Sequence, residues 1–213
     1  MGITIIGAGN MARGIGTRLV AAGETVTIVD RSPDKAEALA QELGAQAKPG
    51  ATVKAAPQGA AIQDDTVVLA LYYPVEKEVA TQYRDQLAGK TVIEISNPLN
   101  ATFDDLATPP GTSAAEDIAA TLPQSTVVKA FNTTFAGPLV EGQVAGQPLD
   151  VFLASDDADA KARFAQTLQA ADLRPLDVGP LKRARQLEGL GLLHITQQFT
   201  LNTGFGSAVK IIS

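Results

Sequence analysis

The stretch that decides the fold is residues 2–12, which read Gly-Ile-Thr-Ile-Ile-Gly-Ala-Gly-Asn-Met-Ala. Residues 2–6 form an apolar, β-branched run that stops at a glycine, as a buried parallel strand does. Residues 10–22 then carry apolar side chains at helical spacing, and Gly23 supplies a helix end. The sequence therefore predicts a strand, a glycine-rich turn and a helix in direct succession.

The turn has the pattern G-x-G-x-x-A, formed by Gly7, Gly9 and Ala12. Gly7 permits the tight turn, Gly9 lets the backbone approach a pyrophosphate, and Ala12 keeps the helix close to the sheet. The helix N-terminus offers free N–H groups and a positive dipole end to the phosphates. Any tight strand-to-helix turn uses glycine, but the position between a strand and a helix favours dinucleotide binding.

The alternation of strands and helices continues along the chain. Further strands are predicted at residues 25–29, 51–54, 66–71, 91–95, 126–130, 149–154 and 173–178. Further helices are predicted at residues 34–43, 75–87, 113–122, 156–171 and 180–201, with Ser32 and Ser113 as N-caps. This spacing predicts an α/β fold with a doubly wound, mostly parallel sheet of the Rossmann type and a small C-terminal cap. A Pro/Gly-rich seam at residues 135–148 divides a dinucleotide-binding domain (1–140) from a C-terminal α/β extension (141–213).

Composition excludes several kinds of chemistry. The 213 residues include no cysteine and one histidine, which excludes thiolate catalysis, disulfides and metal sites with two histidine ligands. A net charge of -6 argues against nucleic-acid binding, and we see no carboxylate cluster that calls for a metal. Without a basic, hydrophobic leader or an apolar run of roughly 18 residues, we expect a cytoplasmic protein with no membrane partner. An enzyme with so few reactive side chains would depend on a bound cofactor.

The residues after the second strand bear on the choice of dinucleotide. Asp30 follows the glycine-rich turn at close to the spacing of roughly 20 residues at which an acidic residue binds a ribose 2′-OH. This spacing favours NAD. Arg31, Ser32 and Lys35 follow at once and suit a 2′-phosphate, although these cations also suit a solvated helix start. We favour NADP(H) and leave NAD open.

Ligands of an open parallel sheet lie beyond the carboxyl ends of the strands. Asn97 and Asn132 follow predicted strands and are candidates for orienting a carboxamide, although Asn-Pro at Asn97 is also a common turn opener. Tyr72 and Tyr73 are candidates for packing on a flat ring. The predicted cofactor-binding residues are Gly7, Gly9, Asn10, Met11, Ala12, Asp30, Arg31, Ser32, Lys35, Leu71, Tyr72, Tyr73, Asn97, Pro98, Leu99, Ala130 and Asn132. No acid or base is predicted to be catalytic.

The glycine turn, the Arg-Ser pair at 31–32, and the segments 96–99, 129–133 and 173–181 resemble the deazaflavin-dependent NADP oxidoreductases. The chain also resembles related bacterial NADPH-dependent reductases and the reductase domain of the STEAP-type metalloreductases. The resemblance covers essentially the whole chain. It implies hydride transfer between NADP(H) and a deazaflavin (coenzyme F420) or flavin, a small-molecule redox partner, with the protein positioning the two rings.

Two other functions remain open. An imine reductase resembling the pyrroline-5-carboxylate reductases shares the N-terminal motifs, but that family adds a long helical dimerisation domain, for which the residues after 180 leave little room. A non-catalytic NADP(H) redox sensor would hold the nicotinamide in the same way.

The last predicted helix carries the single histidine, His194, among apolar residues, so we interpret it as packed or at an interface rather than as a catalytic acid. Lys182, Arg183 and Arg185 near the start of that helix suit either an anionic cofactor tail or a solvated, ion-paired face. An Ala- and Gly-rich helix surface suggests a homodimer.

Overall fold

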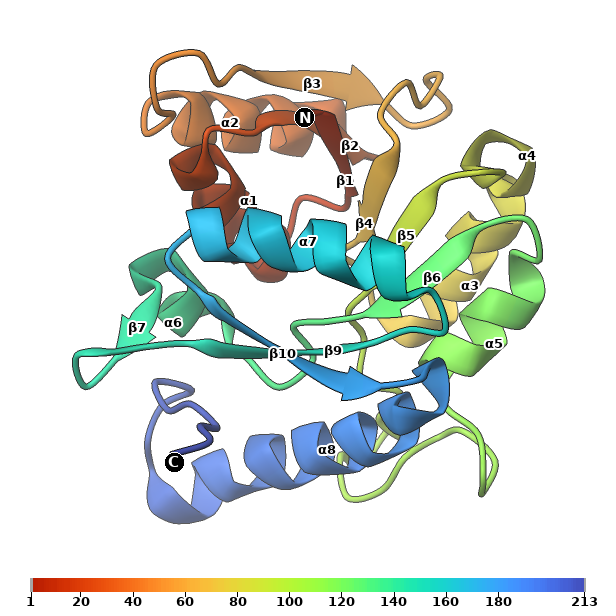
Figure 1. Cartoon of the computed structure of the whole chain (residues 1–213), viewed down its shortest axis with the longest axis vertical. Helices are drawn as coiled ribbons and strands as arrows, with labels where there is room; N and C mark the ends of the chain where they lie inside the picture. Colours follow the sequence, from red (N-terminus) through yellow and green to blue (C-terminus); the bar gives the residue numbers. More distant parts are fainter. Residues whose placement is uncertain (1, 213) are drawn as a thin grey trace.

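An eight-stranded sheet runs through the protein in the computed structural model, which describes residues 2–212 (Figure 1). Its strands, in chain order, are β1 (Gly2–Ile6), β2 (Thr25–Asp30), β3 (Val53–Pro57), β4 (Thr66–Leu69), β5 (Thr91–Glu94), β6 (Thr126–Lys129), β9 (Asp150–Ala154) and β10 (Arg174–Gly179). The order across the sheet is β10-β9-β6-β5-β4-β1-β2-β3. Neighbouring strands are parallel except β6 and β9, which meet antiparallel at one residue pair, Lys129 and Ala154. The predicted doubly wound, mostly parallel sheet is confirmed.

Helices cover both faces of this sheet. They are α1 (Asn10–Ala22), α2 (Pro33–Gly44), α3 (Tyr73–Gln82), α4 (Arg84–Leu87), α5 (Ala114–Thr121), α6 (Ala136–Glu141), α7 (Ala158–Ala170) and α8 (Ala184–Leu201), with a 3₁₀ turn, η1 (Leu181–Arg183), before α8. Successive strand residues alternate between two cores: Ile93 packs with α1, α2 and α7, whereas Val92 packs with α3 and α5. Burial on both faces is the reason that these strands read as continuous apolar runs.

The element boundaries differ from the predicted ones where a tertiary contact sets them. The third strand is shifted to Val53–Pro57, because its register with β2 places Val53 beside Val26. The helix predicted at 75–87 divides into α3 and α4 at Tyr83, whose buried hydroxyl accepts a hydrogen bond from the N–H of Gly59. The last helix begins at Ala184 rather than at residue 180, after η1.

The Pro/Gly-rich segment after β6, residues 135–148, contains regular secondary structure. It holds the short helix α6 and a hairpin of β7 (Gln143–Val144) and β8 (Gln147–Pro148). Strands β9 and β10, which follow the predicted boundary at residue 140, extend the same sheet. The division into two domains stays a prediction.

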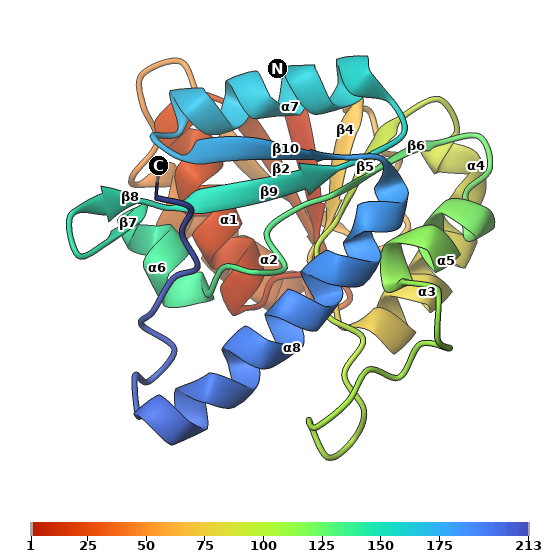
Figure 2. The same cartoon turned by 60° about the horizontal axis from the view of Figure 1, so that its bottom comes forward.

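Helix α8 and the C-terminal tail lie beside the carboxyl ends of the central strands. Figure 2 shows α8 leaving the end of β10 and running diagonally past that edge, after which the tail turns back toward β9. Asp150 on β9 fixes the tail: its carboxylate accepts hydrogen bonds from Lys210 Nζ at 2.9 Å and from the N–H of Ile211 at 2.8 Å. Within residues 2–212, no helix has the length and apolar character to cross a membrane.

Candidate functional site

The glycine-rich turn lies between β1 and α1, as predicted. Gly7 has a φ of +116°, and a Cβ there would lie 2.4 Å from the carbonyl oxygen of Ala70, so the turn requires glycine. Gly9 is the N-cap of α1 without a side-chain cap bond, and a Cβ at Gly9 would meet nothing within 4 Å. Ala12 is fully buried in the core beneath. The start of α1 therefore has uncapped N–H groups and room for a phosphate.

The next residues of α1 place a cation near this helix start. Asn10 is exposed and accepts a hydrogen bond from Arg13 at 3.3 Å, whereas Met11 is half-buried against the core. Arg13 also pairs with Glu42 of α2 at 2.8 Å, and the two side chains are 45% and 39% exposed. The pair links the first turn of α1 to α2.

Asp30 ties two turns together at the ends of β1 and β2. Its Oδ2 accepts a hydrogen bond from the N–H of Ala8 at 2.9 Å, and its Oδ1 accepts one from the N–H of Ser32 at 2.8 Å. Ser32 occupies the N-cap position of α2 without a side-chain cap bond. Arg31 and Lys35 are exposed, and neither forms an ion pair with any residue in the described range 2–212. A hydroxyl and two unpaired cations thus lie beside the carboxylate.

The two tyrosines after β4 have different surroundings. Tyr72 is 85% exposed, so its ring is free to contact a ligand. The hydroxyl of Tyr73 donates a hydrogen bond to Asp117 on α5 at 2.5 Å, and Asp117 also pairs with Lys77 at 2.7 Å. Burial and the neighbouring carboxylate raise the pKa of Tyr73 well above its usual range. Tyr73 therefore joins α3 to α5, and a contact of its ring with a nucleotide stays a prediction.

Asn97 and Asn132, which are 35 residues apart, meet at the ends of β5 and β6. Asn97 Nδ2 donates to the carbonyl oxygen of Asn132 at 2.7 Å, and Asn132 Nδ2 donates to Asn97 Oδ1 at 2.9 Å and to the carbonyl oxygen of Leu187 at 2.8 Å. We call these two residues the amide pair. Asn132 Oδ1 accepts no hydrogen bond within residues 2–212, which leaves an acceptor for a ligand N–H group.

The remaining predicted residues line the same strand ends. Leu71 and Leu99 are half-buried, Pro98 and Ala130 are buried, and Leu99 forms a bridge with Leu106. Phe131, the residue between Ala130 and Asn132, has a φ of +60°. A bulky residue adopts this left-handed conformation only when the surrounding structure holds it there.

Helix α8 contacts the amide pair at a glycine. A Cβ on Gly191 would lie 2.3 Å from Asn97 Oδ1 and 3.0 Å from Asn132 Nδ2. The helix passes this close because position 191 has no side chain. Sequence reasoning did not identify Gly191, and a glycine inside a helix that is otherwise rich in leucine was the available signal.

A buried charge cluster lies directly behind Asn97. Lys129 Nζ donates to Glu94 Oε2 at 2.6 Å, to Glu188 Oε1 at 2.9 Å and to the carbonyl oxygen of Ser96 at 2.6 Å. Burial alone would lower the pKa of Lys129, but the two carboxylates outweigh it and raise that pKa. Burial also raises the pKa of Glu188, against the effect of Lys129. The ammonium therefore stays charged and holds the turn that carries Asn97.

A third carboxyl, that of Glu76 on α3, belongs to the same buried charge cluster. Its side chain is fully buried, and neither oxygen has a hydrogen-bond partner within residues 2–212. Burial raises the pKa of Glu76 well above its usual range, and the charge of Glu94 acts in the same direction. Sequence reasoning missed the cluster, although Glu94 and Lys129 occupy the same position in consecutive apolar strands and pair in the sheet register.

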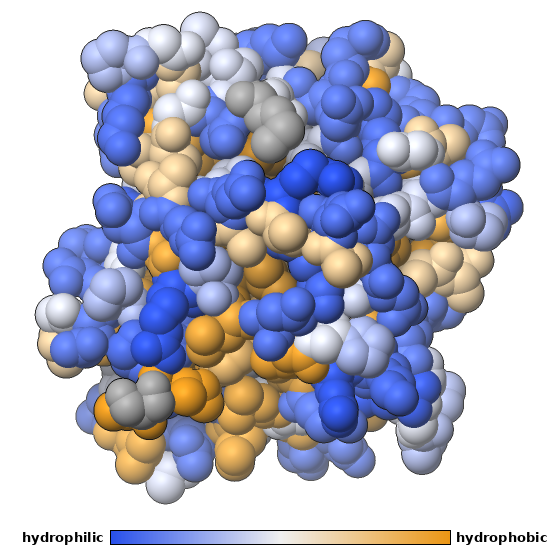
Figure 3. All heavy atoms as spheres, viewed as in Figure 1, coloured by the Kyte–Doolittle hydropathy of each residue, from blue (hydrophilic) through white to orange (hydrophobic). Residues whose placement is uncertain are grey.

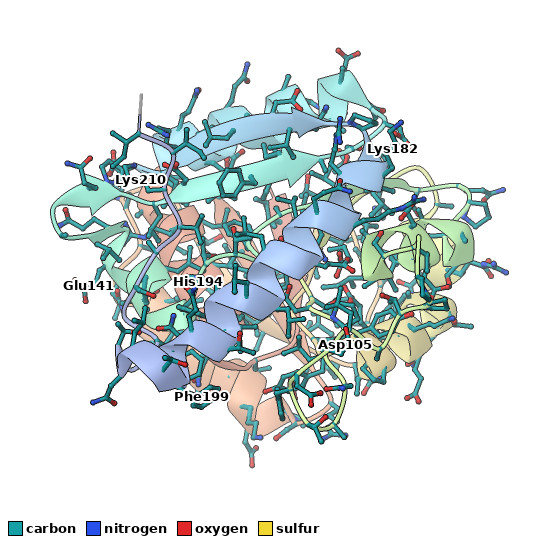
Figure 4. All side chains as sticks on the ribbon, turned by 90° about the horizontal axis from the view of Figure 1, so that it is seen from below. Asp105, Glu141, Lys182, His194, Phe199 and Lys210 are labelled. Carbon is teal, nitrogen blue, oxygen red and sulfur yellow. The ribbon has the colours of Figure 1, made fainter. Side chains whose placement is uncertain are left out.

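In the structure His194 is packed and Arg185 is ion-paired, whereas Lys182 and Arg183 lie exposed in η1 without an ion pair to any residue of the described range. His194 is 6% exposed, stacks on Phe135 with a centroid distance of 4.3 Å, and hydrogen-bonds through Nε2 to Ser207 Oγ at 2.8 Å. Burial lowers its pKa. Arg185 forms an ion pair with Glu116 at 2.6 Å. Figure 4 shows Lys182, His194 and Phe199 in succession along η1 and α8, with Asp105 on the loop beside the helix.

Two hollows lie away from these residues. One of about 370 Å³ lies between α2 and β3, and the other, of about 410 Å³, lies beside Ile3 and Phe164 at the opposite ends of the strands. Neither is lined by the predicted cofactor-binding residues. Within residues 2–212, no three His, Cys, Asp or Glu side chains are grouped so as to hold a metal ion.

Comparison with known proteins identifies the kind of protein that carries this site. Residues 2–98 match the family described as NADP oxidoreductase, coenzyme F420-dependent. The F420-dependent NADP reductase of Methanothermobacter thermautotrophicus is 30% identical over 201 residues, covering 88% of this chain and 85% of that protein. Like these relatives, the chain is an NAD(P)H-dependent oxidoreductase. It belongs to the coenzyme F420-dependent NADP oxidoreductase family.

A longer relative and two solved structures are also similar. Rat metalloreductase STEAP3 is 30% identical over 190 residues, and the match spans 89% of this chain but only 36% of that protein. A putative F420-dependent NADP reductase from Arthrobacter sp. FB24 has a TM-score of 0.83 at 29% identity, covering 99% of both chains. Pyrroline-5-carboxylate reductase from Coxiella burnetii, at 22% identity and a TM-score of 0.65 over 93% of this chain and 66% of that chain, shares the fold.

Proposed function

We propose that this protein binds NADP(H) across the carboxyl ends of β1, β2, β5 and β6 and transfers hydride between the nicotinamide and a deazaflavin, coenzyme F420, or a flavin. The observation that carries this proposal is the uncapped start of α1 behind Gly9, where a Cβ would meet nothing within 4 Å. The same end of the sheet holds the amide pair with its available acceptor, Asn132 Oδ1. The names of the relatives, which are F420-dependent NADP reductases, support the choice of acceptor.

Each part of the nucleotide has suitable residues in this arrangement. The N–H groups of Gly9 and the first turn of α1 would bind the pyrophosphate. Arg31, Ser32 and Lys35 would bind the 2′-phosphate through charge-assisted hydrogen bonds. Both carboxylate oxygens of Asp30 already accept hydrogen bonds from backbone N–H groups. Asp30 would therefore fix the conformation of the turn, and the neighbouring cations would bind the 2′-phosphate.

The nicotinamide end would be held by the amide pair. Asn132 Oδ1 would accept a hydrogen bond from the carboxamide, and the exposed ring of Tyr72 would cover one flat face. When bound, the nicotinamide supplies the hydride, which is a two-electron transfer. The chain contributes position and exclusion of water, and good alignment of two reactants lowers a barrier by about 7 to 11 kcal/mol in favourable cases.

Titration of the purified protein with NADPH and NADH tests the nucleotide. We expect tighter binding of NADPH, and an Arg31→Ala variant should lose more affinity for NADPH than for NADH. Glu37→Ala, a change at an exposed residue further along α2, is the matched control. Equal losses in Arg31→Ala would show that Arg31 does not contact the 2′-phosphate.

Absorbance of NADPH at steady state tests the acceptor. We expect oxidation of NADPH with coenzyme F420 or with FMN or FAD, and no oxidation with an imine such as pyrroline-5-carboxylate. Turnover of the imine alone would favour the imine reductase. Binding of NADPH without turnover of any acceptor would favour a redox sensor.

We further propose a homodimer that covers the exposed apolar end of α8 and the tail. Figure 3 shows hydrophobic residues gathered on the lower part of the face, where the C-terminal tail and the end of α8 lie in Figure 1. The large exposed hydrophobic residues of this region are Leu193, Phe199, Leu201, Phe205, Ile211 and Ile212. Light scattering of the purified protein tests the dimer, and a monomer mass at about 100 μM would argue against it.

A further inference from the structure

The buried charge cluster contains more acids than bases. Three carboxyl groups, those of Glu76, Glu94 and Glu188, surround the single ammonium group of Lys129, and all four side chains are fully buried. If all were ionised, the interior would hold an excess of two negative charges. An unpaired buried charge is so costly that a carboxyl group takes up a proton instead.

Hydrogen bonds indicate which carboxyl carries the proton. Glu94 accepts from Lys129 Nζ, and its Oε1 accepts from both the N–H and the hydroxyl of Ser96, at 2.6 and 2.5 Å. Glu188 accepts from Lys129 Nζ at 2.9 Å and from the N–H of Ala114, at the start of α5, at 3.0 Å. Glu76 accepts none. Glu94 and Glu188 therefore have the donors that a charged carboxylate needs, and Glu76 is the neutral member.

The cluster and the amide pair share a turn of the chain. Lys129 Nζ and Glu94 together hold the carbonyl, the N–H and the hydroxyl of Ser96, and Asn97 is the next residue. A third negative charge, on Glu76, would repel Glu94 and compete for Lys129. It would thereby loosen the three hydrogen bonds that fix the turn before Asn97. Lys129 and the hydroxyl of Ser96 act in the opposite direction and lower the pKa of Glu76, but burial and the charge of Glu94 outweigh them. From the start of the same helix, Tyr73 also interacts with the charge of Glu76.

We propose that Glu76 is a positioning residue, which holds the amide pair in its nicotinamide-binding arrangement only while its carboxyl group carries a proton. The inference rests on the proposed function, because it assigns the nicotinamide to the amide pair. It adds that the nicotinamide half of the nucleotide is bound in a pH-dependent way through a residue that does not contact it. The phosphate half, which is held by α1 and the residues after β2, does not depend on Glu76.

The test compares two ligands on the unaltered protein. NADPH and 2′-phospho-ADP-ribose share the pyrophosphate and the 2′-phosphate, but only NADPH has the dihydronicotinamide. Their dissociation constants are measured by calorimetry at several values between about pH 7 and 10, where the phosphate charges no longer change. We expect the affinity for NADPH to fall about fivefold relative to that for the fragment, the factor that one neutral hydrogen bond is worth. Deprotonation of lysines at high pH lowers the affinity for both ligands, so the ratio of the two dissociation constants does not change for that reason.

Two variants identify the titrating group. Glu76→Gln cannot ionise, so the alkaline loss of NADPH affinity relative to the fragment should disappear. Glu78→Gln, at an exposed position of the same helix, should keep that loss. Urea unfolding without nucleotide provides a second readout, in which Glu76→Gln should stay more stable than the unaltered protein as the pH rises.

Each outcome decides between the two proposals. If the two ligands respond alike to pH in the unaltered protein, or if Glu76→Gln keeps the alkaline loss, the inference about Glu76 is wrong and the proposed function stands. If neither NADPH nor the fragment binds at any pH, the proposed function is wrong and the inference falls with it. The comparison of ligands on the unaltered protein holds even if Glu76→Gln does not fold.

Discussion

The close contact between α8 and the amide pair gives a sharp prediction for Gly191→Ala. A methyl group at this position would lie 2.3 Å from Asn97 Oδ1 and 3.0 Å from Asn132 Nδ2. Neither amide can turn aside freely, because each is hydrogen-bonded to the other and Asn132 is also bonded to Leu187 of α8. Gly189 is the other glycine of α8, and a Cβ there would meet nothing within 4 Å. Gly189→Ala is therefore the matched control.

The magnitude follows from three contributions. Overpacking costs about 1–3 kcal/mol, and the loss of the two reciprocal hydrogen bonds of the amide pair adds about 1 kcal/mol each. Replacing glycine by alanine inside a helix returns about 1 kcal/mol. Gly191→Ala should therefore lower the free energy of unfolding by about 2–4 kcal/mol, whereas Gly189→Ala should raise it by about 1 kcal/mol. For a chain of this size, this difference corresponds to about 10 °C in the melting temperature.

Urea and thermal unfolding of the two variants measure this difference. Titration with NADPH on the folded variants measures its effect on the site, where only Gly191→Ala should weaken binding. Equal stabilities of the two variants would refute the reasoning, because they would mean that α8 is not seated on the amide pair.

Three further predictions concern stability. Lys129→Met should lower the free energy of unfolding by about 3–5 kcal/mol in urea, because it leaves buried carboxylates without their cation; an unchanged midpoint would contradict the ion pairs. Burial opposes ionisation of Asp150, but the N–H of Ile211 and Lys210 Nζ outweigh it and lower the pKa of Asp150. The contribution of Asp150 to the free energy of unfolding is therefore present above its pKa in the unfolded chain and is lost as the pH falls through its pKa in the folded protein. Asp150→Asn should therefore cost about 2 kcal/mol near neutral pH and speed cleavage of the C-terminal tail by a protease, and an unchanged cleavage rate would argue against this anchor. Ser113→Ala should cost about 1 kcal/mol, because the N-cap of α5 accepts a hydrogen bond from the N–H of Glu116; a loss below the error of the urea melt would show that this cap contributes nothing.

Much of the fold was predictable because local signals agreed with the tertiary structure. Helix α1 has the predicted bounds, Asn10–Ala22, since its glycine-rich start and its left-handed stop at Gly23 are both local features. Ser113 caps α5 as predicted, for the same reason. Helix α3 ends early because Tyr83 is drawn into the core, and no neighbouring residue signals that contact.

The candidate site was predictable one residue at a time. Gly7 and Gly9 follow from their turn, and Asn97 and Asn132 follow from their places at strand ends. Their pairing was not predictable, because side chains 35 residues apart meet only when β5 and β6 lie side by side. The raised pKa of Glu76 was not predictable either, since it depends on complete burial beside Glu94.

The sequence by itself determined that this protein has a mostly parallel α/β sheet, a glycine-rich turn between its first strand and first helix, and very few reactive side chains, because periodicity, glycine positions and composition are local properties of the chain. Only the tertiary structure decided that α8 passes over the amide pair at Gly191, that Asp30 joins two turns, and that four ionisable groups share one buried space. The physical reason is that burial and electrostatic pairing depend on which distant segments pack together, and no local pattern specifies them.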